Sequence, residues 1–171
     1  AVQIAGGFID FQMGFAMANI IDPQTGAQSP LMCQFLNFLM LLVLLSINGH
    51  HLILDGIFYS YQFMPMDQFI PNFGEEGTAL FIIKIFVSVF AIAFQMSAPI
   101  VATLFLVTLA LGITAKTVPQ LNIFVVGFAV KIGVGLLVLF ISMGVLIEVM
   151  KNVNELMIYA MRDLMRVLGG A

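Results

Sequence analysis

The sequence has 171 residues, of which 61% are hydrophobic and 9% are charged, and its mean hydropathy is +1.11. Soluble domains carry about 25% charged residues, so this composition excludes an ordinary soluble domain and predicts an all-α membrane protein with several spans. The net charge of −3 is spread along the chain, which argues against a nucleic-acid partner, and the single cysteine excludes a disulfide within the chain.

The first segment, residues 1–17, has a helical pattern that is interrupted by Gly6-Gly7 and by the polar residues Asp10 and Gln12. Asp10 and Gly14 lie four residues apart, so a helix places them on one face. Because a carboxylate that faces lipid is costly, we expect Asp10 and Gln12 to face protein or water, on a surface for helix packing or for a partner.

The segment from Gly14 to Pro30 is the one long break in the apolar N-terminal half. Asp22-Pro23 and Gly26 are typical of a turn, because proline fixes φ, aspartate bonds its own backbone and glycine allows positive φ. A loop between membrane helices lies in water, is buried in protein or lines a cavity. Taken alone, the segment favours a passive surface loop.

A second helix is predicted from Leu31 to Phe63, with Pro30 at its first position and Ser29 as its N-cap. Such a helix would be roughly 48 Å long, which exceeds the ~30 Å hydrocarbon core of a bilayer. We therefore expect it to protrude, tilt or break near Asn48-Gly49.

Two histidines and an acid follow that point, at His50, His51 and Asp55. His51 and Asp55 share a helix face, but adjacent residues such as the two histidines point about 100° apart, and no third ligand is evident. We expect helix-end packing here and no metal site.

After a connecting loop at residues 64–77, a third helix is predicted from Glu75 to Thr114, with a kink at Pro99. Small and weakly polar residues fall on one stripe of this helix, which allows another helix to approach closely. The stripe consists of Ser88, Ala91, Gln95, Ala98 and Ala102.

A short turn at residues 112–120 leads to a fourth helix from Leu121 to Leu146, so the third and fourth helices form an antiparallel hairpin. Gly127, Lys131 and Gly135 repeat every four residues and form a second close-packing stripe with a cation in its middle. Cations inside membrane helices are functional candidates, so Lys131 is expected to face a partner. Residues 148–167 mix charges with apolar residues and predict a separate amphipathic helix that lies at an interface or on a partner.

Enzymatic chemistry is not expected, because no nucleophile lies beside a base and no phosphate-binding or dinucleotide-binding motif is present. We accordingly assign no catalytic residue, no metal ligand and no cofactor.

Several stretches together resemble a known family, the FliR family of the flagellar type III export apparatus. They are GGFIDFQMGFAMA, DPQTG, LLSINGHHLIL and PQLNIFVVGFAVKIGVGL, and the pattern runs along nearly the whole chain. The family has further N-terminal helices, and since this chain begins at Ala1 in mid-pattern, we expect an N-terminal part to be missing. One departure is Ala129, where the family usually has proline.

The resemblance implies a helical export gate in the bacterial inner membrane, at the flagellar basal body, that passes unfolded flagellar proteins. It implies FliP, FliQ and FlhB as partners, with residues 1–63 similar to FliP and residues 78–171 similar to the FliQ hairpin. It also implies that the segment of about residues 14–30 is a pore plug, which reverses the passive reading of this loop. The plug and gate residues would be Met13, Gly14, Phe15, Met17, Ile20, Ile21, Asp22, Pro23, Gly26 and Pro30.

Two rival functions stay open. One is the homologous export subunit of a virulence injectisome. The other is a carrier of small solutes or ions that uses Asp10 and Lys131 as intramembrane charges, although no clear internal repeat of the kind common in transporters is found.

Overall fold

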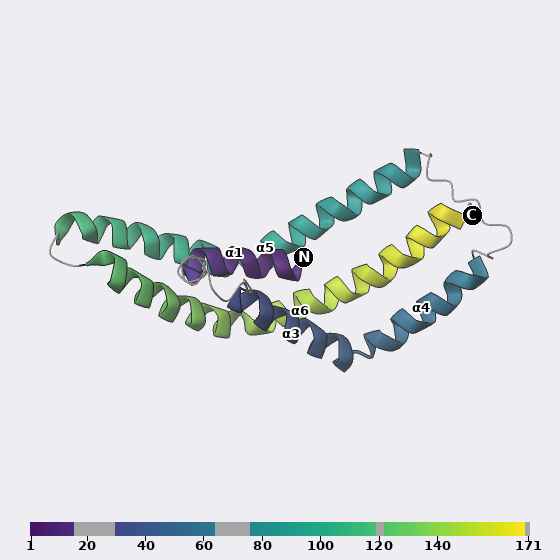
Figure 1. Cartoon of the computed structure of the whole chain (residues 1–171), viewed down its shortest axis with the longest axis horizontal. Helices are drawn as coiled ribbons and strands as arrows, with labels where there is room; N and C mark the ends of the chain where they lie inside the picture. Colours follow the sequence, from purple (N-terminus) through teal and green to yellow (C-terminus); the bar gives the residue numbers. More distant parts are fainter. Residues whose placement is uncertain (16–29, 64–75, 119–121, 170–171) are drawn as a thin grey trace, which may run out of the picture. The chain divides into compact units, whose positions relative to one another are not determined.

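The computed structural model describes residues 1–15, 30–63, 76–118 and 122–169. These residues form five helices and no strand: α1 (Val2–Met13), α3 (Leu31–Ser46), α4 (Gly49–Phe63), α5 (Glu76–Thr117) and α6 (Ile123–Gly169) (Figure 1). The prediction of an all-α fold is therefore confirmed.

Two of these helices are long and apolar enough to cross a membrane, at Gly77–Thr117 and Ile123–Val167. The pair α3 and α4 would add a third span if it is counted as one bent unit. Apolar side chains remain exposed along both long helices, with Phe94 of α5 66% and Phe140 of α6 80% exposed. A surface of this kind requires lipid or other protein around it.

The predicted second helix breaks where its polar residues stand. α3 ends at Ser46, α4 begins at Gly49, and the two are bent by 74°. Asn48 at the break has a φ of 55°, a left-handed conformation that asparagine tolerates better than most residues. The expected break near Asn48-Gly49 is confirmed.

The start of α3 differs by one residue from the expectation. The helix begins at Leu31, so Pro30 stands just before the first helical position, and its carbonyl accepts the bond from the Gln34 N–H at 3.1 Å. The predicted cap at Ser29 lies outside the described residues.

The prediction of two separate helices over residues 121–167 is wrong. α6 runs without a break from Ile123 to Gly169. No proline stands between these residues, and the buried side chains continue from Leu146 through Met150 to Asn154 at a constant spacing of four. The charged residues after Leu146 thus alter the exposed side of the helix without interrupting it.

The chain divides into two compact units by its internal packing. The first unit holds residues 1–39 and 93–146, and the second holds residues 40–92 and 147–171. This division follows packing and differs from the sequence-based division at residues 63 and 78. α3, α5 and α6 each contribute one part to each unit.

In the first unit, α1 buries one face completely. Ala5, Ile9 and Met13 are each 0% exposed, whereas Phe11 on the opposite face is 73% exposed. Buried residues of α3, α5 and α6 complete this core, among them Leu36, Met96, Ile100, Leu104 and Leu139.

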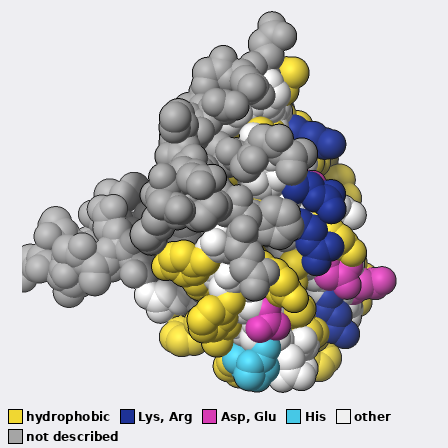
Figure 2. Space-filling model, turned by 90° about the vertical axis from the view of Figure 1, so that its right-hand side faces the viewer, with side chains coloured by type: hydrophobic (Ala, Val, Ile, Leu, Met, Phe, Trp, Pro, Cys, Tyr) yellow, Lys and Arg dark blue, Asp and Glu magenta, His cyan; other side chains and the backbone are white. Residues whose placement is uncertain are grey.

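In the second unit, few side chains are fully buried. Met150 and Asn154 are 0% exposed and Met165 is 9% exposed, all on one stripe of α6. Figure 2 shows a face on which Lys and Arg side chains gather in a row beside hydrophobic side chains. The exposed basic residues of this unit are Lys84, Lys151, Arg162 and Arg166.

Candidate functional site

The Asp10 carboxylate lies at the junction of α1 and α3. Asp10 Oδ1 accepts a hydrogen bond from the Met32 N–H, and Oδ2 accepts one from the Cys33 N–H, each at 3.1 Å. The residue is 2% exposed. Burial raises the pKa of the Asp10 carboxyl, and the two backbone N–H bonds oppose that rise.

Gly6 lies one helical turn before Asp10 and faces the same part of α3. A Cβ atom built on Gly6 would lie 2.5 Å from the Cα and 3.0 Å from the backbone N of Cys33. The Cys33 thiol in turn donates to the Gln3 carbonyl at 3.5 Å. The two backbones therefore approach so closely at this crossing that a side chain at Gly6 has no space.

The end of α1 rests on α6. A Cβ atom on Gly135 would lie 2.8 Å from Met13 Cε and 3.1 Å from Met13 Cγ. Gly14 ends α1 with a φ of 89°, and its N–H donates to the carbonyls of Asp10 and Phe11. This left-handed helix end suits glycine, and a Cβ atom there would lie 3.3 Å from the Phe128 ring.

A cavity of about 310 Å³ lies beside this contact. Met13 and Gly14 of α1, Thr108 and Leu111 of α5, and Lys131 of α6 contribute to its lining. Its remaining lining residues are Gly112, Ile123, Phe124, Gly127 and Phe128.

Lys131 is half-buried in this cavity, and among the described residues its ammonium forms no hydrogen bond or ion pair. The Thr108 hydroxyl already donates to the Leu104 carbonyl at 2.8 Å. A cation in so apolar a setting is costly unless an acceptor reaches it.

The stripe that contains Lys131 faces two different elements. A Cβ atom on Gly127 would lie 3.3 Å from Leu111 Cδ1 of α5, whereas Gly135 faces Met13 of α1. The structure thus brings Met13, Gly14, Gly127, Lys131 and Gly135 together, although the sequence indicated only two unconnected sets.

The small-residue stripe of α5 lies on the surface of the chain. Ala91, Gln95 and Ala102 are exposed, and Ser88 and Ala98 are half-buried. Gln12 of α1 is also half-buried. The exposed stripe of α5 leaves room for a helix from outside the chain.

Among the predicted plug residues, Phe15 and Pro30 are half-buried. The others beyond Gly14 lie outside the described residues, namely Met17, Ile20, Ile21, Asp22, Pro23 and Gly26.

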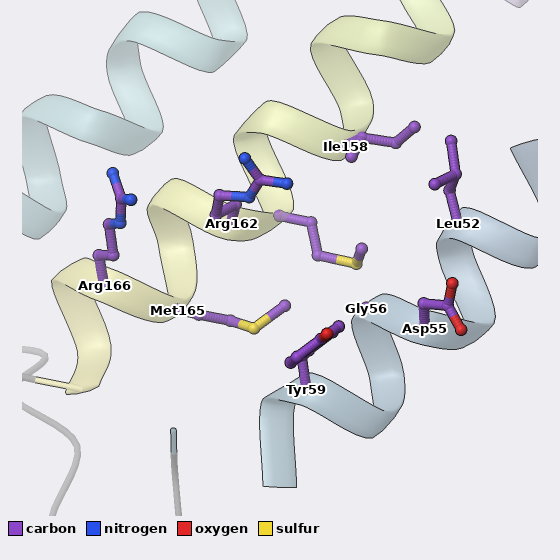
Figure 3. A pocket seen from close by; sticks show the side chains of 9 residues that line it. Leu52, Asp55, Gly56, Tyr59, Ile158, Arg162, Met165 and Arg166 are labelled. Carbon is purple, nitrogen blue, oxygen red and sulfur yellow. The ribbon is translucent and has the colours of Figure 1, made fainter. Parts of the chain in front are cut away.

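A second cavity, of about 430 Å³, lies between α4 and α6 in the second unit. The Met165 side chain extends from α6 toward α4 and Tyr59, whereas Arg162 and Arg166 extend from α6 away from α4 (Figure 3). In the part of the chain that the structure describes, no ion pair joins either arginine to Asp55.

Two polar side chains of the second unit have buried atoms without a hydrogen-bond partner among the described residues. They are Nδ1 of His50 and both amide atoms of Asn154. The rings of His50 and His51 lie 4.2 Å apart. The described ranges contain no group of three residues that could hold a metal ion. Sequence reasoning missed Asn154, although a polar residue on the apolar stripe of α6 was its visible signal.

Comparisons with known proteins identify related sequences. Residues 1–157 match the model of a family described as bacterial export proteins, family 1. The chain is 60% identical over 169 residues to the flagellar biosynthetic protein FliR of Bacillus subtilis, covering 99% of this chain and 65% of that protein. It is 29% identical over 136 residues to the protein of the same name in Escherichia coli, covering 80% of this chain and 51% of that protein.

A relative with a different name is the Yop proteins translocation protein T of Yersinia pestis. It is 26% identical over 161 residues, covering 94% of this chain and 60% of that protein. The chain thus spans between half and two thirds of the length of these relatives.

Proposed function

The chain belongs to the bacterial export proteins, family 1, and we propose that it is a subunit of the flagellar type III protein export gate. In this proposal it lies in the bacterial inner membrane and forms part of the pore that passes unfolded flagellar proteins. The observation that carries the proposal is the match to the family along residues 1–157, in a chain with two helices long enough to span a membrane.

The exposed apolar surface supports an assembly with other membrane subunits. FliP and FliQ are the proposed neighbours, with FlhB joined to the assembly, and lipid would cover the outermost faces. The stripe of small residues on α5 offers a surface for close helix approach, because Ala91 and Ala102 are exposed and carry no bulky side chain. Ala91→Leu and Ala98→Leu would overpack such a contact, and both are expected to reduce copurification of the subunits.

Lys131 is the proposed contact for an acidic group of a neighbouring subunit. Its half-buried ammonium lines an apolar cavity and has no acceptor among the described residues. Lys131→Leu would leave that acid buried and unpaired, so we expect weaker assembly or export. Lys131→Arg keeps the charge and is the matched control. Equal copurification of the leucine and arginine variants would contradict this role.

The segment of residues 14–30 is the proposed pore closure. A channel wide enough for an unfolded chain would leak ions unless it is closed, and methionine adapts its shape to varied passengers. The described flanks support the proposal through their anchors, because Met13 lies against Gly135 and Gly14 against Phe128. Deleting residues 19–28 should leave assembly intact and raise ion conductance. Unchanged conductance in an assembled gate would show that this segment is not the seal.

A second candidate function is export in a virulence injectisome. The similarity to the Yop proteins translocation protein T favours it, but the identity is lower than with the Bacillus protein. Motility of a cell that lacks its own FliR separates the two candidates. Restored swimming supports the flagellar role, and secretion of virulence proteins without swimming supports the other.

Copurification tests the proposed function at the level of assembly. The full-length protein, tagged and coexpressed with FliP and FliQ, should come out of the membrane in one complex with both. A protein that purifies alone under conditions that keep FliP and FliQ together would overturn the proposal.

A further inference from the structure

We propose that Asp10 is a positioning residue that ties α1 to the N-terminus of α3, and that export depends on this tie. The export half of the proposal rests on the proposed function, whereas the tie itself does not. Asp10 belongs to α1, and its carboxylate would affect export indirectly, by holding α3 in place.

Among the described residues, no side chain next to the start of α3 caps this helix. The first N–H groups of a helix have no partner within the helix and are commonly satisfied by the side chain of the residue just before it. That residue is Pro30, which has no side-chain acceptor. Asp10 supplies the missing acceptors from another helix, with one oxygen on Met32 and the other on Cys33.

In the described part of the chain, no cation forms an ion pair with the Asp10 carboxylate. Among the described residues its hydrogen-bond partners are the two N–H groups of α3, and it is 2% exposed. The positive end of the α3 dipole therefore stabilises its charge. Moving α3 away from α1 would leave both the carboxylate and the two N–H groups without partners, which is costly in a buried place.

The tie connects α3 to the candidate site through a short series of contacts. Gly6 lets the backbones of α1 and α3 meet one turn before Asp10. Met13 lies three residues after Asp10 on the same helix and contacts Gly135 of α6. Because these residues all lie on the buried face of α1, a shift of α1 relative to α3 also disturbs the contact beside Lys131.

Cys33 provides a local reporter of the tie. It is the only cysteine in the 171 residues of the sequence, it is half-buried, and its own N–H is bonded to Asp10. Cysteines elsewhere in the complex are replaced by serine, so that the labelling rate reports on Cys33 alone. In the assembled full-length complex, Asp10→Asn keeps the size of the side chain but turns an NH₂ group toward one of the two N–H donors. We expect maleimide labelling of Cys33 to become at least about tenfold faster, since bonds to charged groups are among the stronger ones, and protein secretion to fall.

A second variant separates a tie from a mere cap. Asp10→Ala removes both the tie between α1 and α3 and the cap of α3. Adding Pro30→Ser returns a capping oxygen that belongs to α3 itself. The proposal predicts that Cys33 stays rapidly labelled and secretion stays low in this double variant. Recovery of both to the level of the unmodified protein would overturn the proposal, because Asp10 would then be only a cap.

The remaining outcomes are also decisive. Unchanged Cys33 labelling in Asp10→Asn and Asp10→Ala would overturn the tie. Faster labelling with normal secretion would support the tie and overturn its role in export. If the unmodified protein supports no secretion at all, the proposed function fails, and the labelling rates alone still decide the tie.

Discussion

Two glycines at helix contacts show how differently the two units are built. Gly6 in the first unit faces the backbone of Cys33, with a built Cβ atom 2.5 Å from its Cα. Gly56 in the second unit faces the Met161 side chain, whose terminal methyl group occupies the place of a Cβ atom. A backbone in the way cannot move without moving its helix, whereas the end of a methionine side chain can rotate aside.

The surroundings of the two contacts follow the same division. The α1–α3 crossing is completed by the two hydrogen bonds of Asp10 and borders a core of fully buried side chains. The α4–α6 contact borders a cavity of about 430 Å³. The difference indicates that the first unit holds one fixed geometry, while the second unit has space to repack.

Gly6→Ala is expected to have the largest effect. The added methyl group meets the Cys33 backbone, so α1 and α3 must separate, at a cost of about 1–3 kcal/mol or more. Thermal unfolding of the purified complex measures this as a clear loss of stability. Gly7→Ala is the control, because a Cβ atom there meets nothing within 4 Å and alanine favours a helix. Equal unfolding temperatures for the two variants would contradict the tight crossing.

Gly135→Ala should have an intermediate effect. The added methyl group meets Met13 Cε at 2.8 Å and Cγ at 3.1 Å, so the methionine must shift as a whole and not only at its tip. We expect a loss of about 1 kcal/mol, at the low end of overpacking costs. Gly133→Ala is the matched control, since a Cβ atom at Gly133 meets nothing within 4 Å. A stability for Gly135→Ala equal to that of its control would show that α1 is not seated there.

Asn154→Leu, in the second unit, should raise the stability of the protein, whereas Gly6→Ala and Gly135→Ala lower it. Both amide atoms of Asn154 are buried without partners among the described residues, so an apolar side chain of similar size removes a desolvation cost of about 1 kcal/mol or more. The isolated protein should gain stability. Asn152→Leu, at an exposed position two residues earlier, is the control. A loss of stability confined to the assembled complex would instead reveal a partner for Asn154 in another subunit.

Gly56→Ala should have the smallest effect. The methyl group displaces only the end of Met161, which can turn into the adjacent cavity. Alanine offsets part of this cost through its higher helix propensity, so the net change should stay within about 0.5 kcal/mol. Gly144→Ala, at a position with open space, gives the propensity gain alone. A loss as large as that of Gly6→Ala would show that the second unit is as tightly packed as the first.

The sequence predicted most of this fold because the relevant signals are local. Apolar helices, the break at Asn48 and the need of Asp10 for a polar environment all follow from residues close together in the chain. The continuity of α6 differs from the sequence-based prediction, because the change of composition after Leu146 indicates a boundary although no helix-breaking residue stands there.

The candidate site could be predicted only in pieces. Asp10 and Lys131 were singled out by their charge, but the partners of Asp10 are 22 and 23 residues away in sequence, and no periodicity reveals such a pairing. The meeting of Met13 with Gly135 depends in the same way on how α1 crosses α6. Contacts between distant segments are set by tertiary packing, which a pattern along one helix does not contain.

Secretion of flagellar proteins shows whether the chain works as a subunit of an export gate. A cell that lacks its own FliR, FliP and FliQ would receive the full-length protein together with the FliP and FliQ of the same source, and flagellar protein in the medium would be quantified. We expect the unmodified protein and Gly7→Ala to restore secretion, whereas Gly6→Ala should not. Absence of secretion with the unmodified protein, although the three proteins are present in the membrane, would contradict the assignment as an export-gate subunit.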